Sequence, residues 1–182
     1  MPLYLNDDQT MLRDTAKPFI ADAAPVKHLR SLRQDATGFS RDLWKQFAEM
    51  GFTGILVPEA HGGMGMGHVE AGIVLEEIGR NLTPSPFLVS SVVTATALKA
   101  GSADLKARWL PGLIAGDSVF AVAVDEGPKH RPERIAARAE KSGNGFRLSG
   151  KKDFVLHGAS ADMLVVAART SGADDDAEGI TL

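Results

Sequence analysis

The sequence predicts an α+β chain, with an all-α helical N-terminal domain followed by an antiparallel β-barrel or sandwich domain that is incomplete in this chain. Apolar residues recur at helical spacing up to about residue 116. At Asp117 the hydrophobic period changes from 3.6 to 2 residues. Short apolar runs separated by turn residues then follow at intervals of about ten residues, which is typical of antiparallel sandwiches and barrels. We therefore expect a helical domain over residues 1–117 and a partial β domain over residues 118–182.

Helix caps mark the first two predicted helices. Asn6 can cap a helix, and Gln9 three residues later completes a variant of the capping box. Pro18 lies inside the apolar pattern that follows, so a bend or an early stop is expected there. Ser40 is the cap of the next helix, and Gly51 suits the position after its last turn.

The segment 61–67 (HGGMGMG) holds four glycines and is predicted to be a loop. A phosphate-binding function is the alternative, but the segment lacks the Lys-Ser/Thr of a P-loop and the G-x-G-x-x-G spacing, so a turn between helices is favoured. Helix resumes over residues 69–79. Residues 87–100 are small or apolar on nearly every face, which indicates a buried central helix. A last helix is expected from Asp104 to near Gly116.

Strands are expected in the remainder of the chain. A continuous apolar run over residues 118–125 predicts a buried strand. Further strand-length runs occupy residues 135–140, 145–148, 152–156 and 163–168. Residues 171–178 are small and acidic, which indicates an exposed loop, and another strand begins at residue 179. So small a sheet leaves an open edge, so we expect further polypeptide to complete it.

Composition excludes several classes of function. The formal net charge of −3 provides no basic field for nucleic acid. The absence of cysteine removes disulfides, thiolate metal sites and a cysteine nucleophile, and fits a cytoplasmic protein. The five histidines show no metal-ligand spacing, so no metal site is expected. The first residues lack the features of a signal peptide, and the longest apolar stretch, residues 92–100, is too short to span a bilayer.

Three local features have both a structural and a functional interpretation. Adjacent Glu76 and Glu77 point in different directions on a helix, so one of them facing solvent is favoured over an acid–base pair. The basic run 129–131 (KHR) follows a buried strand and suits a phosphate, although a solvated turn is favoured on charge alone. On a strand, Phe154 and Leu156 share one face; Phe154 could stack on a flat cofactor ring, although core packing is favoured.

Taken in order, several segments resemble the acyl-CoA dehydrogenase family. The chain's first helix (6–14) fits the family's first helix, and residues 161–169 follow in register near the end of the chain. Between them the segments match short family patterns over nearly the whole chain, and the order makes the resemblance strong although each piece is weak. These segments are LWKQFAEMG (43–51), VPEAHGGMG (57–65), EEIGR (76–80), WLPGLIAGD (109–117) and GKKDFVLHG (150–158).

The resemblance implies an FAD-dependent enzyme that removes hydrogen across the α and β carbons of an acyl-CoA thioester. In the family a glutamate takes the α proton while flavin accepts a hydride, and the protein holds the two reactants together. That glutamate usually lies in a C-terminal helical domain absent from this sequence, so no catalytic residue is assigned here. The resemblance also implies an electron-transfer flavoprotein-like acceptor and a homo- or hetero-oligomer.

Cofactor residues carry over from the family only by register. The backbone at Ala123 and Val124 would serve the flavin ring edge, and Phe154 stands for a tryptophan beside the ring. The family's hydroxyl side chains are replaced by Val124, His130 and Leu156. Losing such partners costs on the order of 1 kcal/mol each. The positive charges of Lys129 and Arg131 would favour the cofactor.

The acyl pocket in the family is lined by the helix that corresponds to residues 87–100. By register, Leu88 and Val92 would contact the acyl chain. Two alternatives to an active dehydrogenase remain open. One is a non-catalytic or flavin-less partner subunit of a heteromeric acyl-CoA dehydrogenase, and the other is a flavin-dependent relative that acts on nitro, sulfur or aromatic substrates.

Overall fold

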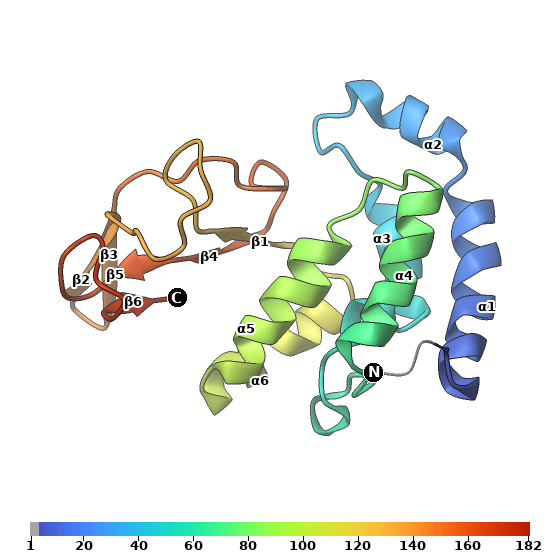
Figure 1. The fold of residues 1–182 in the computed structure, drawn as a ribbon, viewed down its shortest axis with the longest axis horizontal. Helices are drawn as coiled ribbons and strands as arrows, with labels where there is room; N and C mark the ends of the chain where they lie inside the picture. The colour runs from blue at the N-terminus through green and yellow to red at the C-terminus, as the bar shows by residue number, and fades with distance from the viewer. Residues whose placement is uncertain (1–3) are drawn as a thin grey trace. The chain divides into compact units, whose positions relative to one another are not determined.

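The computed structural model describes residues 4–182 and divides the chain into two compact units, Met1–Val119 and Phe120–Leu182 (Figure 1). The first unit is helical and the second contains the strands, so the chain has the α+β fold class predicted from the change of period. The interpretation of the extreme N-terminus falls partly on residues 1–3, which lie outside the described residues. Among the described helices, none is long and apolar enough to cross a bilayer.

Helices and short helical turns make up the described part of the first unit. The α-helices are α1 (Asp7–Ala23), α2 (Val26–Ser31), α3 (Arg41–Glu49), α4 (His68–Arg80), α5 (Ala95–Ala100) and α6 (Ala103–Ile114). A π-helical segment, η4 (Leu88–Thr94), leads directly into α5. Single 3₁₀ turns are η1 (Leu32–Gln34), η2 (Phe52–Gly54) and η3 (Glu59–His61). The short helix α2 has no side-chain cap, and its sequence carried no signal that predicted it.

The predicted caps of α1 and α3 are confirmed. Asn6 Oδ1 accepts a hydrogen bond from Gln9 N at 2.8 Å, and Gln9 Oε1 accepts one from Asn6 N at 3.1 Å. Ser40 Oγ accepts from Leu43 N at 3.1 Å, and Gly51 follows α3 with a φ of +77°, a conformation that favours glycine. The early stop at Pro18 is wrong: α1 continues through it to Ala23. Pro18 lies on the exposed side of the helix, where water can reach the carbonyl that loses its amide partner.

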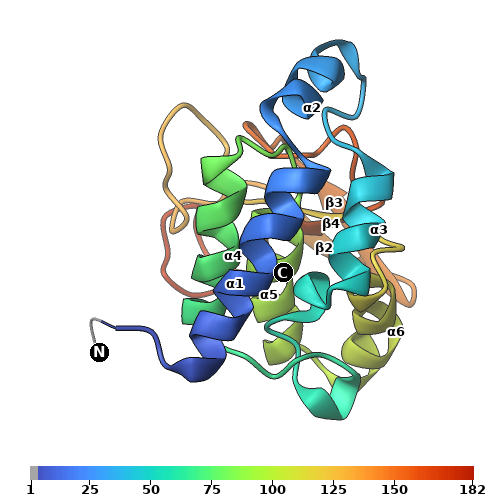
Figure 2. The ribbon, with the colours of Figure 1, turned by 90° about the vertical axis from the view of Figure 1, so that its right-hand side faces the viewer.

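The core of the first unit is an aromatic cluster around Phe47, whose side chain is fully buried. Its ring centroid lies 5.8 Å from those of Phe19 and Phe52, 6.2 Å from Trp44 and 6.5 Å from Phe87. These rings come from α1, α3, η2 and the residue before η4, so the cluster joins segments distant in sequence. Figure 2 shows α1, α3 and α4 gathered in this unit, with α1 packed against α4.

The predicted central helix over residues 87–100 forms with two differences from the expectation. Its first part winds as the π-helix η4, in which Thr94 Oγ1 donates to Val89 O at 2.8 Å across five positions. The helix is not buried on every face, because Leu88 and Val93 are 46% and 41% exposed. Such π segments occur frequently at functional sites.

Strands in the second unit are short. They are β1 (Phe120–Ala123), β2 (Arg138–Ser142), β3 (Gly145–Ser149), β4 (Met163–Val166), β5 (Ala168–Arg169) and β6 (Ile180–Thr181). One sheet pairs β1 with β4, and the other has the order β3-β2-β5-β6. A small core of Ile135, Ala137 and Ala167 is covered by the half-buried Val124 and Ile180.

Two details of the β prediction are corrected. The pairing is mixed rather than wholly antiparallel, because β1 runs parallel to β4 and β2 runs parallel to β5. The expected strand over residues 152–156 does not form. Phe154 and His157 have φ values of +53° and +58°, and residues in this left-handed region cannot continue an extended strand. The alternation of side chains had the period of a strand, but the backbone turns within it at Phe154 and again just after it at His157.

Candidate functional site

Phe154 and Leu156 are exposed side chains in the second unit. Phe154 is 76% exposed and Leu156 is 61% exposed, so core packing of Phe154 is the wrong interpretation. An exposed phenylalanine in the left-handed region carries conformational strain that packing does not repay. A left-handed backbone at a bulky non-glycine residue is uncommon and marks a position to consider for function. The residue pair thus remains available to a flat apolar partner.

The backbone at Ala123 and Val124 is already engaged. Ala123 is buried at the end of β1, and its carbonyl accepts from Ala167 N at 3.0 Å. The carbonyl of Val124 accepts from Lys152 Nζ at 3.1 Å, while its side chain packs on the small core. Each carbonyl oxygen retains one lone pair. Both carbonyls thus have one partner within the protein and one acceptor position that a further donor could use.

His130 extends into solvent and pairs with its own loop. Its Nδ1 lies 2.9 Å from Asp125 Oδ1, and its side chain is 71% exposed. In the first unit, Leu88 is exposed on η4 and Val92 is half-buried one π turn later.

The glutamate pair on α4 behaves as expected from its spacing. Glu76 is exposed and bonds Arg80 from one turn away. Glu77 is 3% exposed and lies 3.3 Å from Arg80 Nε. The two carboxylates therefore share one arginine and point in different directions, and both are accounted for without an acid–base function. Among the described residues, no group of three or more acidic or histidine side chains is placed to hold a metal ion.

Glu126, next to the basic run, is a polar centre that the sequence did not single out. Its carboxylate accepts from the amides of Ala136 and Ala137 at 2.7 and 2.9 Å and pairs with Lys152 Nζ at 2.7 Å. Both side chains are largely buried, at 16% and 9% exposure. Burial alone would raise the pKa of Glu126, but the bonds from Lys152 and the two amides outweigh burial and lower it.

Replacing Glu126 with glutamine is expected to lower the free energy of unfolding by about 3 kcal/mol at neutral pH, because a largely buried ammonium loses its counter-charge. The lowered pKa means that the ionised carboxylate stabilises the fold above its ordinary pKa of 4.5, and this stability is lost as pH falls through the lower folded value. The difference in unfolding free energy between wild type and Glu126→Gln should therefore become smaller below pH 4.5. Urea unfolding followed by circular dichroism measures it.

The matched control is Glu140→Gln, since Glu140 is exposed on β2 in the same unit. Its effect should stay within about 0.5 kcal/mol at every pH, as for other exposed charges. If the stability difference between wild type and Glu126→Gln stays constant from neutral to acid pH, the ionised carboxylate of Glu126 does not stabilise the fold by pairing with Lys152.

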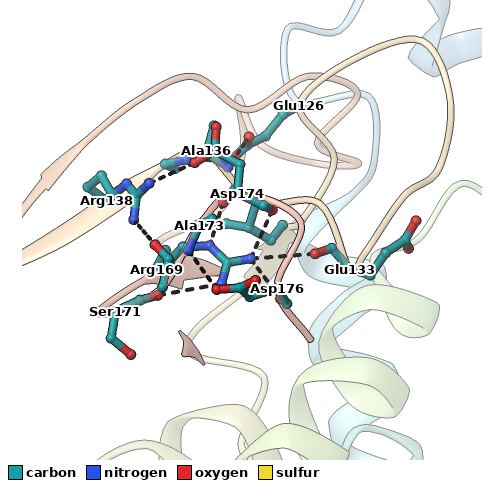
Figure 3. A network of polar contacts seen from close by, with 12 residues as sticks. Glu126, Glu133, Ala136, Arg138, Arg169, Ser171, Ala173, Asp174 and Asp176 are labelled. Atoms are coloured by element: carbon teal, nitrogen blue, oxygen red, sulfur yellow. Dashed lines mark hydrogen bonds and ion pairs between the residues drawn. The ribbon is translucent and has the colours of Figure 1, made fainter. Parts of the chain in front are cut away.

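The second centre missed by sequence reasoning is Arg169, which is only 1% exposed (Figure 3). Its guanidinium donates to six backbone carbonyls and pairs with no carboxylate within residues 4–182. The shorter bonds, at 2.7–3.1 Å, go to Ile135, Asp174, Asp176 and Glu178, and the two at 3.5 Å go to Glu133 and Ser171. The only sequence signal was a charged residue at the end of an apolar run. The network holds the loop 171–178, which is largely exposed, as the sequence predicted.

Comparisons with known proteins identify the family at this point. The profile described as "Acyl-CoA dehydrogenase, N-terminal domain" matches residues 6–117. The chain belongs to the acyl-CoA dehydrogenase family. The family resemblance deduced from the ordered segments is thereby confirmed.

Individual members of the acyl-CoA dehydrogenase family match this chain beyond its helical unit. Mitochondrial isovaleryl-CoA dehydrogenase of Pongo abelii is 32% identical over 91% of this chain and 40% of its own length. Acyl-CoA dehydrogenase FadE27 of Mycobacterium tuberculosis is 35% identical over 81% of this chain and 39% of its own. The chain thus spans about two fifths of the length of these relatives.

Solved structures agree with the fold. The ChsE4–ChsE5 complex of Mycobacterium tuberculosis matches with a TM-score of 0.82 and 30% identity, over 93% of this chain and 46% of that chain. A structure titled "FAD complex of PigA" also reaches a TM-score of 0.82 at 23% identity over 99% of this chain and 48% of that chain, and this likeness concerns the fold alone.

Proposed function

We propose that this chain is part of an FAD-dependent acyl-CoA dehydrogenase subunit that removes hydrogen across the α and β carbons of an acyl-CoA thioester. Family membership and the 32% identity to an isovaleryl-CoA dehydrogenase support the reaction class. The observation that carries the cofactor is Phe154, an exposed aromatic ring held in the left-handed region. When bound, flavin would supply the hydride acceptor.

The chain's own residues would position the reactants. Phe154 would present an aromatic face to the flavin ring, and the remaining lone pairs of the carbonyls of Ala123 and Val124 would accept from ring-edge donors. Leu156 would add apolar cover in place of a hydroxyl. On η4, the exposed Leu88 and the half-buried Val92 would contact the acyl chain. Neither Glu76 nor Glu77 would act as the catalytic base, because both form ion pairs with Arg80.

The proposal extends to location and partners. A cytoplasmic, oligomeric enzyme that passes electrons to an electron-transfer flavoprotein-like acceptor fits the cysteine-free, mildly acidic composition and the family. We propose neither a nucleic-acid partner nor a membrane-spanning segment for this chain.

A second candidate is a non-catalytic partner subunit of a heteromeric acyl-CoA dehydrogenase. The replacements Val124, His130 and Leu156 favour it, because they remove side-chain partners for a flavin. A similar structure is itself titled as a complex of two components, ChsE4 and ChsE5.

Flavin uptake separates the two candidates. Purified protein titrated with FAD should develop the visible absorbance of bound flavin with one equivalent per chain. The Phe154→Ala variant should bind FAD about tenfold more weakly, because an aromatic contact contributes about 1 kcal/mol or somewhat more. Its free energy of unfolding should change by less than about 0.5 kcal/mol, since the side chain is exposed.

Phe146 provides the matched control for this experiment. It is 62% exposed on β3 in the same unit, so Phe146→Ala also removes a largely exposed ring. Its FAD affinity should equal that of wild type. A protein that takes up no FAD alone, but does so when co-expressed with a homologous subunit, would contradict the first candidate and favour the second.

A further inference from the structure

Lys152 is a largely buried ammonium that joins two segments of the second unit. Its Nζ donates to the carbonyl of Val124 at 3.1 Å and pairs with Glu126 Oε1 at 2.7 Å, and its side chain is 9% exposed. Val124 directly follows β1, and Lys152 lies 28 positions later in the chain. The contact therefore fixes the backbone after β1 against the segment that leads to Phe154.

Two further contacts hold the same crossing of segments. Asp153 N donates to Asp125 O at 2.8 Å, one residue further along each segment than the contact of Lys152. Gly150 packs so closely on Ala137 that a Cβ atom on this glycine would lie 2.7 Å from Ala137 Cα. A larger residue at Gly150 would push the segment away, so the chain is held on both sides of Lys152.

Glu126 fixes Lys152 to a third segment. Its carboxylate accepts from the amides of Ala136 and Ala137 at 2.7 and 2.9 Å, and Figure 3 shows Glu126 beside Ala136. The same oxygen, Oε1, accepts from both Lys152 Nζ and Ala137 N. One atom therefore joins the two segments, and the ammonium has little freedom to move.

Phe154 follows the last of these contacts by one residue. Its φ of +53° lies in the left-handed region, which a bulky residue rarely adopts unless the surrounding structure imposes it. Because the side chain is 76% exposed, packing of the ring contributes little to imposing it. The backbone contacts remain as the cause: those of Lys152 and Asp153 before Phe154, and a turn closed after it by Gly158 N on Val155 O at 3.0 Å.

We propose that Lys152, held by Glu126, is a positioning residue that sets Phe154 in its left-handed conformation and fixes it relative to the carbonyl of Val124. The consequence for a flavin rests on the proposed function: the ring and the carbonyl would form one preorganised surface. Preorganised groups lose less conformational entropy on binding. Lys152 acts through Phe154, because its own ammonium is occupied by Val124 and Glu126.

Fluorine NMR and amide hydrogen exchange, both on protein without flavin, test the positioning. The protein carries fluorinated phenylalanine, and Phe154→Ala identifies the Phe154 resonance. Lys152→Met removes the ammonium and keeps much of the side-chain length. It should change the Phe154 resonance and speed exchange of the Asp153 amide by about tenfold or more, because charge-assisted hydrogen bonds are lost.

Two other variants of Lys152 make the test independent of the folding of Lys152→Met. Lys152→Arg keeps the charge and several donors, so it should retain the wild-type resonance and slow exchange. Lys152→Gln keeps a neutral donor group, and its exchange should lie between the rates of wild type and Lys152→Met. If Lys152→Met does not fold, faster Asp153 exchange in Lys152→Gln than in wild type is the expected result.

Arg138→Met is the matched control. Arg138 also bonds one carbonyl, that of Gly172 at 2.8 Å, and one carboxylate, that of Asp174 at 2.7 Å, within the same unit. Its replacement removes the same kinds of contact at a place that does not touch the crossing. The Phe154 resonance and the Asp153 exchange rate should therefore equal those of wild type.

Titration with FAD measures the consequence for the cofactor. Lys152→Met should bind FAD about fivefold more weakly than wild type, the effect of one lost contact, and Arg138→Met should bind it equally well. Because Lys152 acts through Phe154, the double variant Lys152→Met/Phe154→Ala should bind FAD no more weakly than Phe154→Ala alone. A general loss of stability would not produce this non-additivity.

The proposal is overturned if the folded Lys152 variants show the wild-type resonance and exchange, or if Arg138→Met changes them as much. Full additivity of Lys152→Met and Phe154→Ala in FAD affinity would also overturn it. If wild type takes up no FAD while Lys152→Met still releases Asp153 and Phe154, the proposed flavin function fails and the positioning by Lys152 stands, so the two failures are distinguishable.

Discussion

Replacing Arg169 with methionine is expected to lower the free energy of unfolding by about 4 kcal/mol, because several buried carbonyls lose a charged donor at once. Methionine has a similar length and fills much of the same space, so lost packing contributes little. What it cannot replace are the bonds at 2.7–3.1 Å to Ile135, Asp174, Asp176 and Glu178. Those oxygens surround a side chain that is only 1% exposed, so water cannot replace the lost donors.

The loss should be local as well as large. Both tryptophans of the chain, Trp44 and Trp109, lie in the first unit, so their fluorescence does not report on Arg169 directly. Hydrogen exchange followed by mass spectrometry should show faster exchange in the loop 171–179 and in β2, β5 and β6. Arg147→Met, on an exposed strand position, is the control and should leave exchange unchanged. If the loop amides of Arg169→Met exchange at the wild-type rate, the hydrogen bonds from Arg169 to the backbone carbonyls do not hold the loop.

Phe47→Ala is expected to cost about 4 kcal/mol of unfolding free energy, the range for truncating a fully buried phenylalanine. The ring touches the aromatic rings of α1, α3, η2 and the residue before η4, so its loss opens a cavity where these segments meet. Trp44 lies 6.2 Å away by ring centroids, so its fluorescence follows the urea transition at the site of the change.

The controls for Phe47 separate the cavity from loss of apolar surface. Phe47→Leu keeps most of the volume and should cost clearly less than alanine does. Leu105→Ala, at a side chain that is 45% exposed on α6, should cost less than about 1 kcal/mol. Equal losses for Phe47→Ala and Leu105→Ala would contradict the placement of the core.

Local signals in the sequence located much of the helical unit. The cap at Asn6, the cap at Ser40 and the glycine after α3 each act within one turn, so a short stretch of sequence holds all the partners. The early stop expected at Pro18 was wrong because a helix pattern does not report exposure, and exposure decides whether water can reach the freed carbonyl. The π turns of η4 had no sequence signal either.

Strand alternation was a weaker guide in the β unit. The run at residues 152–156 alternates like a strand, yet positive φ values at Phe154 and His157 turn the backbone away. The residues that the family register assigned to flavin remain a prediction. The structure leaves Phe154 and Leu156 exposed, as such a site needs, but places His130 on a solvent-facing pair with Asp125.

The sequence by itself determined the α+β class, the change of period at Asp117, the main helices and the family. Each of these follows from the order of residue types along the chain, because its signals act between residues that are close in sequence. Only the tertiary structure decided that Arg169 is buried among carbonyls and that Glu126 and Asp174 are paired with basic side chains. Those facts depend on partners such as Lys152 and Arg138, which lie 26 and 36 positions away. A charged residue looks the same in a sequence whether its partner is water, a carbonyl or another charge, and folding alone selects among them.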